Sequence, residues 1–334
     1  MIIKEAILQE ELNRVEKFLN KFDLILDKTI TKTLYVEDDY QNIIGTISTC
    51  DYIIKCLAVD NNYQSENLAS LLVNEVLNDF RINKIYNYQV FTKPNYKNVF
   101  LSLGFKEIIE TEKVIMLEGG AYFINDKISE MKNVINNTFS YTDESSDIGC
   151  VVINGNPLTN GHMQLIEYAA RKHKMLLLFV VEENKSMFSF EERFSMAYLC
   201  TRRLQNVCVL PSSNYIVSSS TFPSYFLKSR DEALEEYNKI DALIFEKYFI
   251  KELFIKKRYV GKETRLEMID YNNTLKDILK DKLEIIDRYT LDDEIISASK
   301  VRSLIEKNDI DEALKYIPKE IAFIFRSIVS SKYE

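Results

Sequence analysis

The chain has 334 residues, 46% of them hydrophobic, which is enough for two ordinary domains that each bury a core. Its 43 basic and 51 acidic side chains are mixed along the sequence and give a formal charge of -8, which argues against nucleic acid as a partner. Five cysteines without CxxC spacing argue against a disulfide framework or a zinc site and favour the cytoplasm. The longest apolar run, 175–181, is too short to cross a bilayer, so no membrane partner is expected.

The first half alternates helical and strand-like patterns. Apolar residues at helical spacing between Leu8 and Leu19 predict an opening helix. The patterns that follow predict one α/β domain over residues 1–118. In chain order they are strands at 33–37, 42–49 and 51–59, a helix at 68–82, a strand at 86–92, a helix within 95–105 and a strand near 114–118.

The periodicity weakens between residues 119 and 147. The Gly119-Gly120 pair and the polar run SYTDESSD bracket one expected short helix. We interpret 119–147 as a linker and 148–334 as a second domain.

The second domain opens with an uninterrupted apolar strand at 148–154, of the kind buried on both faces of a parallel sheet. A helix from Met163 to His173 and a strand at 175–181 follow, and this β-α-β order implies a right-handed crossover with parallel pairing. Further expected elements are a strand at 207–211, a helical region at 221–253, a strand at 258–261 and a helical tail that begins in SASKVRSLIEKN. We therefore predict a doubly wound, Rossmann-like parallel sheet.

Both histidines of the chain lie between Gly155 and His173. In a parallel sheet, ligands bind beyond the carboxyl ends of the strands, where Thr159, Gly161 and His162 are expected. Gly161 permits a close backbone approach, and the free amides of the helix's first turn form an anion site. His162 and Thr159 are candidate hydrogen-bond donors to a phosphate. The alternative is that His162 only caps the helix and Gly161 is an ordinary turn glycine.

A second stretch, ISASKVRSLI, covers residues 296–305. Ser297 or Ser299 is expected to cap the following helix. Together with Lys300 and Arg302, these hydroxyls and amides also suit a second anion site. The cap and the phosphate site are both open interpretations.

A third stretch, EENKSMFSFEER, follows the second strand of the sheet and reaches the same edge. Lys185 is the cation best placed there to meet a polyphosphate, although most lysines are simply exposed. Arg193 and the pair Glu191-Glu192 are interpreted as a solvated first helical turn without a catalytic role.

Together the three stretches resemble the HxGH/TxGH nucleotidyltransferase superfamily, in which Thr159-Asn160-Gly161-His162 and ISASKVR contact ATP phosphates. The first half separately resembles the GNAT acetyltransferase fold. Its pyrophosphate-binding pattern, Q/R-x-x-G-x-G/A, matches Gln64 to Ala69, with Asn67 where the pattern has glycine. Gln64, Asn67 and Ala69 are therefore candidates for binding a pantetheine or CoA-like group.

A GNAT-like domain ahead of a TxGH domain is similar to the citrate lyase ligases. The resemblance spans nearly the whole chain and includes KCLAVD, FTKP, NPLTNGH, LLFVVEE, STFPSYFLK, IDYN and ISASKVR. It implies that ATP adenylates acetate with loss of pyrophosphate. The acetyl group then passes to the thiol of a dephospho-CoA-derived prosthetic group on the acyl carrier subunit of citrate lyase.

The resemblance also implies roles for the candidate residues. His162, Lys185 and Arg302 are expected to be catalytic, and ATP is expected to bind through Thr159, Gly161, His162, Ser297, Ser299 and Arg302. Mg²⁺ is expected on the polyphosphate, without a metal site made by the protein itself.

Two rival functions stay open at this point. One is an adenylyltransferase for a pantetheine-phosphate-like cofactor, fused to an active acetyltransferase. The other is a nucleotide-sensing adaptor with a decayed site. Exchange of pyrophosphate into ATP, and its dependence on acetate, distinguishes the three.

Overall fold

The computed structural model describes residues 2–26, 29–140, 142–183, 186–216, 227, 230–287, 290–291 and 294–333. The chain divides into two compact units. The first runs to Asp126 and includes a later segment that ends at Ile240. The second contains the segment that begins at Lys127 and the rest of the chain from Asp241.

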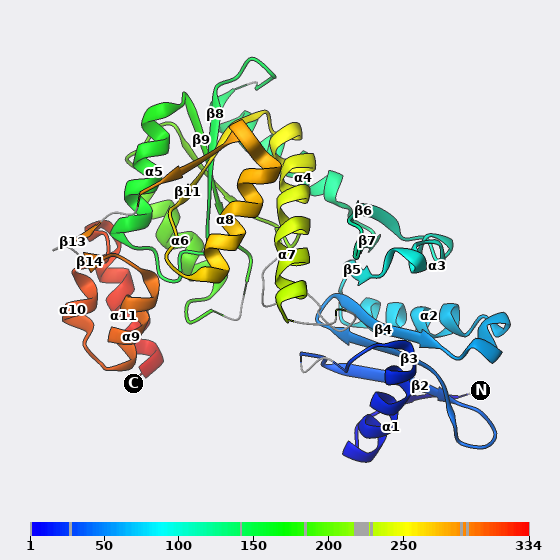
Figure 1. The fold of residues 1–334 in the computed structure, drawn as a ribbon. Helices are drawn as coiled ribbons and strands as arrows, with labels where there is room; N and C mark the ends of the chain where they lie inside the picture. The colour runs from blue at the N-terminus through cyan, green and yellow to red at the C-terminus, as the bar shows by residue number, and fades with distance from the viewer. Residues whose placement is uncertain are drawn as a thin grey trace. The chain divides into compact units, whose positions relative to one another are not determined.

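The first unit is built on a seven-stranded sheet in the order β1-β2-β3-β4-β5-β7-β6 (Figure 1). Neighbouring strands are antiparallel except β4 and β5, which are parallel. The strands are β1 (Ile3–Glu5), β2 (Lys32–Glu37), β3 (Ile43–Cys50), β4 (Ile53–Val59), β5 (Asn87–Thr92), β6 (Lys106–Glu110) and β7 (Ile115–Gly120). The helices are α1 (Gln9–Leu19), α2 (Leu68–Ile82) and α3 (Lys97–Ser102), with a 3-10 turn at Asn61–Glu66 before α2.

Helices cover both faces of this sheet. Buried side chains of α2 and α3 pack on one face against Leu34, Val36 and Ile54. Tyr35 points to the opposite face, because side chains alternate along a strand, and its hydroxyl donates to Glu11 of α1. The expected helix at 68–82 and the strands around it are confirmed. The edge strand β6 was not predicted from the sequence.

The second unit is a doubly wound α/β fold, as predicted. Its five strands are parallel and ordered β10-β9-β8-β11-β12. They are β8 (Ile148–Ile153), β9 (Met175–Val180), β10 (Val207–Pro211), β11 (Ile255–Gly261) and β12 (Leu283–Ile286). Its helices are α4 (Ile124–Phe139), α5 (Asn160–Lys172), α6 (Phe190–Thr201), α8 (Leu266–Leu279), α9 (Ala298–Glu306), α10 (Ile310–Leu314) and α11 (Ala322–Tyr333). Helix α7 (Arg230–Ile244, continued by a π-helix at Phe245–Ile250) belongs to the first unit up to Ile240 and to the second from Asp241. Two short strands, β13 (Thr290–Leu291) and β14 (Glu294–Ile295), form a separate hairpin.

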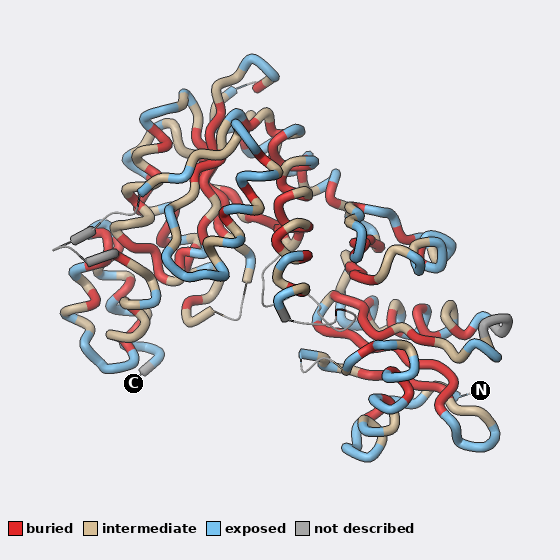
Figure 2. The backbone as a smooth tube through the Cα atoms, viewed as in Figure 1, coloured by how far each residue is buried: buried red, intermediate tan, exposed pale blue. Residues whose placement is uncertain are grey.

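The two faces of the parallel sheet pack against different helices. Val151 and Leu178 lie in one core with buried side chains of α5, α6, α9 and α11. Phe179 points to the other face and contacts Phe245 and Phe249. The central strands of both sheets form buried bands in Figure 2, since both of their faces are covered.

Several elements differ from the sequence-based expectations. The short helix expected in the linker is α4, which has 16 residues. Helix α5 begins at Asn160, three residues before the expected start, so His162 lies inside its first turn. The elements α8 and β12 were not predicted, and the helical region expected at 221–253 is described from Arg230 onward.

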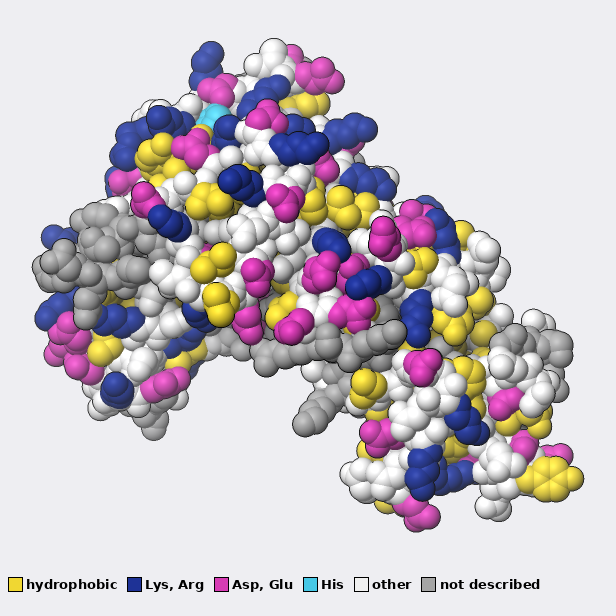
Figure 3. All heavy atoms as spheres, in the orientation of Figure 1, with side chains coloured by type: hydrophobic (Ala, Val, Ile, Leu, Met, Phe, Trp, Pro, Cys, Tyr) yellow, Lys and Arg dark blue, Asp and Glu magenta, His cyan; other side chains and the backbone are white. Residues whose placement is uncertain are grey.

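The five cysteines, Cys50, Cys56, Cys150, Cys200 and Cys208, are all buried, and none of them forms a disulfide. Burial raises the pKa of the Cys150 and Cys200 thiols to about 12. Among the described residues, no helix combines the length and apolar character needed to cross a membrane. On the face drawn in Figure 3, basic and acidic side chains are interspersed, in keeping with ion pairs such as Lys113 with Glu232.

Candidate active site

The strand order of the parallel sheet defines where a ligand belongs. The chain moves outward from β8 through β9 to β10 on one side, and through β11 to β12 on the other. The order therefore reverses between β8 and β11, and ligands of such sheets bind beyond the carboxyl ends of the strands at this switch point. We call the row of these strand ends the carboxyl edge. The loop 154–159 leaves β8 at this edge and leads directly into α5.

His162 and Thr159 interact with each other at the start of α5. Thr159 has extended backbone angles and is the residue before the first turn. Its backbone N–H donates to Nδ1 of His162 over 3.1 Å, and its Oγ1 lies 2.8 Å from the same nitrogen. Because Nδ1 accepts from an amide, the neutral imidazole bears its proton on Nε2. His162 therefore caps the helix with one nitrogen and keeps a donor on the other.

Thr159 is almost fully buried, with 1% of its surface exposed. Its hydroxyl is engaged with the imidazole of His162. The structure thus places Thr159 as the residue that orients His162. The direct contact with a phosphate expected from the motif stays a prediction.

Gly161 is needed for a contact inside the protein. A Cβ atom built on it would lie 3.3 Å from the carbonyl oxygen of Ile296 and 3.5 Å from its Cβ. A side chain here would be tighter than ordinary contacts and would require the segment before α9 to shift by a few tenths of an ångström. Gly161 thereby lets the two predicted phosphate-binding stretches approach each other.

The stretch ISASKVR forms the N-terminal turns of α9. Ser297 is the N-cap, and its Oγ accepts the amide of Lys300 over 3.2 Å, so the capping interpretation is confirmed for Ser297. Ser299 is exposed, and its Oγ accepts a 3.2 Å hydrogen bond from Arg302.

Arg302 connects this stretch to the first one. Its Nη1 donates to the carbonyl oxygen of Asn156 over 2.6 Å. Burial, together with the nearby positive charge of Arg265, lowers the pKa of Arg302. Arg265 precedes α8 at the end of the loop after β11, a position at the switch point that the sequence did not single out.

The third stretch contains the largest correction. Arg193 was expected to be solvated, but only 1% of its surface is exposed. Its guanidinium donates to four backbone carbonyls, those of Phe188, Asn154, Val181 and Glu183. The sequence offered no signal for this, because the acceptors lie in loops up to 39 residues away.

One residue of the acidic pair beside Arg193 caps the helix. Glu192 forms a reciprocal capping pair with Ser189, through bonds of 2.8 and 3.2 Å, so it fixes the start of α6. Lys185 lies outside the described residues, and its expected role stays a prediction.

The other histidine lies away from this site. His173 precedes β9, and its Nδ1 is 2.5 Å from Oδ1 of Asp147. Its Nε2 is 2.8 Å from the hydroxyl of Tyr259. Both ring nitrogens are thus engaged near the amino ends of the strands, and His173 is structural.

Comparison with known proteins identifies the family. Residues 148–325 match the model of the citrate lyase ligase C-terminal domain, and residues 6–116 match the acetyltransferase (GNAT) domain. A citrate (pro-3S)-lyase ligase of Haemophilus influenzae is 31% identical over 320 residues, which cover 93% of this chain and 93% of that protein. The corresponding protein of Escherichia coli strain K12 is 29% identical, over 92% of this chain and 88% of its own length.

The chain belongs to the citrate lyase ligase family.

A solved structure also aligns with part of this ligase. A GNAT-family acetyltransferase of Staphylococcus aureus covers 36% of the chain and 99% of its own length, at 15% identity and a TM-score of 0.31. The GNAT assignment of the first half rests on the domain match to residues 6–116.

In the first unit of the ligase, the pairing between β4 and β5 ends before the stretch that matches the pyrophosphate-binding pattern. Strands β4 and β5 pair only at Ile53 with Gln89 and at Ile54 with Val90. Beyond this point β4 continues to Val59, and the chain passes through the 3-10 turn into α2. The pattern Gln64 to Ala69 therefore lies where the ladder between the two strands has ended.

Asn67 has the backbone conformation that a glycine would adopt most easily. It is the residue before α2, with φ 54° and ψ 23°. Asparagine is among the few non-glycine residues that tolerate this left-handed region. The replacement of glycine thus preserves the turn. The side chain of Gln64 lies outside the described part of the structure, and Ala69 is in the first turn of α2.

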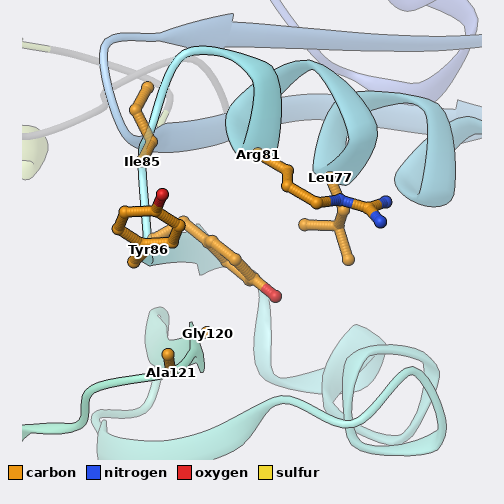
Figure 4. Close-up of a pocket in the computed structure, with 7 residues that line it drawn as sticks. Leu77, Arg81, Ile85, Tyr86, Gly120 and Ala121 are labelled. Atoms are coloured by element: carbon orange, nitrogen blue, oxygen red, sulfur yellow. The ribbon is translucent and has the colours of Figure 1, made fainter.

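A shallow pocket of about 250 Å³ is present in the first unit, at the opposite end of α2 (Figure 4). Leu77 and Arg81 of α2 face Tyr86 across it. Ile85, Tyr88, Gly120 and Ala121 complete the lining. None of the three candidate pantetheine-binding residues belongs to this pocket.

Proposed function

We propose that this ligase adenylates acetate with ATP, releases pyrophosphate, and transfers the acetyl group to the prosthetic-group thiol of the citrate lyase acyl carrier. Family membership supports the ligase class and the link to citrate lyase. The observation that supports adenylation most directly is the 2.6 Å hydrogen bond from Arg302 to Asn156. It joins the two stretches that we propose to bind the phosphates, 154–162 and 297–302.

The first step is a displacement at phosphorus. A carboxylate oxygen of acetate attacks the α-phosphorus, the bond to the bridging oxygen breaks, and pyrophosphate leaves with the electron pair. The protein supplies position and donors, namely the amides of the first turn of α5, Nε2–H of His162 and the guanidinium of Arg302. Such preorganised donors stabilise growing charge more than the ground state.

The second step is an acyl transfer. The carrier thiol, as its thiolate, attacks the acetyl carbonyl carbon, and AMP leaves with the electrons of the carbon–oxygen bond. We assign the pantetheine arm of the carrier to the first unit, beside Gln64, Asn67 and Ala69. The retained turn at Asn67 and the part of β4 that is not paired with β5 support this assignment.

Mg²⁺ would enter as part of the ATP substrate, because this ion is usually held by substrate phosphates and only one or two carboxylates. Its role would be to screen the charge of the polyphosphate. We place the reaction in the cytoplasm, where the thiols of the five cysteines would stay reduced.

Exchange of labelled pyrophosphate into ATP, with and without acetate, tests the proposal. Exchange is expected only with acetate, because carboxylate attack is the reversible first step. Equal exchange without acetate would contradict it. Exchange driven by a pantetheine phosphate instead would favour the rival adenylyltransferase.

The two histidines provide a matched pair of variants. His162→Ala removes a donor at the reacting centre and is expected to slow exchange by ~10²–10³. His173→Ala removes a histidine from the other edge of the sheet and is expected to lower stability while leaving the exchange rate of the folded protein near normal. If both variants slowed exchange equally, His162 would have no special role.

A further inference from the structure

A buried cation lies at the carboxyl edge and has no part in the steps above. Arg193 of α6 is enclosed by the protein, and burial lowers the pKa of its guanidinium. Its four hydrogen bonds go to backbone carbonyls, with Nε 3.1 Å from Phe188, and Nη1 2.7 Å from Asn154 and 2.8 Å from Val181. Nη2 bonds Glu183.

This arrangement is costly for a residue that only fills space. Taking a guanidinium out of water costs free energy, and well-packed apolar side chains of similar volume often serve a core equally well or better. What the guanidinium adds is direction, since its planar fork of donors holds several acceptors in fixed relative positions. The acceptors here belong to two different loops.

The positions of these acceptors connect the three predicted phosphate-binding stretches. Asn154 follows β8 and begins the loop to Thr159, whereas Val181 and Glu183 follow β9 and lead toward Lys185. Phe188, whose carbonyl accepts from Arg193, donates its own amide to Oδ1 of Asn156 over 3.1 Å. The carbonyl of Asn156 in turn accepts from Arg302. A continuous series of bonds therefore runs from Arg193 to Arg302.

We propose that Arg193 is a positioning residue for the adenylation step. It fixes the loops after β8 and β9 relative to each other, and Asn156 transmits that position to Arg302. This inference rests on the proposed function, because it concerns how the site for the polyphosphate is assembled. Arg193 itself contacts no substrate.

The decisive experiment is a double-mutant cycle on pyrophosphate exchange with Arg193→Met and Arg302→Gln. Displacing reacting groups by about 1 Å can slow a reaction ~10²-fold, so Arg193→Met is expected to reduce kcat/KM for ATP by at least about tenfold. If Arg193 acts through Arg302, the double variant loses less than the product of the two single losses. Losses that multiply in full would overturn the inference.

Tyr271→Phe serves as the matched control. The hydroxyl of Tyr271 accepts from Arg258 over 2.9 Å and donates to Asp241 over 2.6 Å, in the core between the sheet, α7 and α8. Its removal destabilises the same unit without touching the loops of the carboxyl edge. At a temperature where both variants are folded, Tyr271→Phe is expected to retain normal kinetics. Equal kinetics in Arg193→Met and Tyr271→Phe would reduce Arg193 to a structural role.

Two further measurements keep the inference testable in every case. If Arg193→Met does not fold, Arg193→Lys replaces it, because a lysine keeps the charge but lacks the fork, and the same kinetic loss is expected. Hydrogen exchange needs no substrate. Amide hydrogens in 154–160, 186–189 and 297–302 are expected to exchange faster in the Arg193 variant than in Tyr271→Phe. Unchanged amide protection would overturn the inference. This result does not depend on the proposed function, because it holds even if pyrophosphate exchange turned out not to require acetate.

Discussion

Gly149 is the second residue of β8 and lies directly against the ring of His173. A Cβ atom on Gly149 would be 2.4 Å from Cδ2 of His173 and 2.9 Å from its Cγ, which is closer than real contacts allow. The ring cannot simply turn away, because Asp147 and Tyr259 hold its two nitrogens. Gly149→Ala must therefore displace the ring and break both bonds.

The size of the loss follows from these contacts. A hydrogen bond to a charged group contributes about 1.5–3 kcal/mol and one between neutral groups about 1 kcal/mol. Replacing glycine by alanine also stabilises a protein by about 0.4–1 kcal/mol, because it reduces the conformational entropy of the unfolded chain. Gly149→Ala is therefore expected to reduce the free energy of unfolding by about 2–3 kcal/mol, measured by urea denaturation followed by circular dichroism.

The His173→Ala background tests the cause. Without the ring there is no clash, so in this background the effect of Gly149→Ala on the free energy of unfolding is expected to change sign. The substitution is then expected to stabilise the protein by about 0.4–1 kcal/mol. A Gly149→Ala variant within 0.5 kcal/mol of the wild type, or one equally destabilised in both backgrounds, would refute the reasoning.

Three other predictions concern single side chains. Asn67→Ala should destabilise the first unit by about 1 kcal/mol, whereas Asn67→Gly should not, because φ is 54° at this residue. Thermal unfolding of both variants tests this, and equal losses of stability would contradict the prediction. The pKa of Asp147 lies below its usual value: partial desolvation raises it, but hydrogen bonds from His173 and from the amide of Lys174 lower it more. Its contribution to stability is thus present above about pH 4 and lost as the pH falls through the lowered pKa. In that acid range, Asp147→Asn should make the free energy of unfolding depend less steeply on pH, and an unchanged slope would argue against this role. Tyr271→Phe should cost about 1–3 kcal/mol in denaturant titrations, because it removes a hydrogen bond from each of two buried polar residues, Arg258 and Asp241. A neutral effect would show that these bonds are replaced.

The sequence was informative where structure follows from local pattern. The helix 68–82 and the strand 207–211 match the predicted bounds, because periodic burial and flanking turn residues specify them. Strand β6 was missed, since an edge strand with mostly exposed or half-buried side chains has little apolar pattern.

The candidate site was predictable to the extent that its residues belong to short motifs. The cap at Ser297 follows from local sequence. The burial of Arg193 does not, because it depends on carbonyls that two loops bring together only in the folded chain. The engagement of Thr159 with the His162 imidazole likewise depends on how the helix begins, three residues earlier than expected.

The five enclosed thiols give the protein built-in reporters of local opening. Cys50 and Cys56 lie in adjacent strands of the first unit, and Cys150, Cys200 and Cys208 lie in three elements of the second. A thiol reacts as its thiolate, so burial and a raised pKa both slow the reaction of Cys150 and Cys200. Modification by a thiol reagent thus requires that the strand or helix around each cysteine opens first. The order in which the five residues are labelled in the wild-type chain would then rank the opening of each element, without any introduced probe.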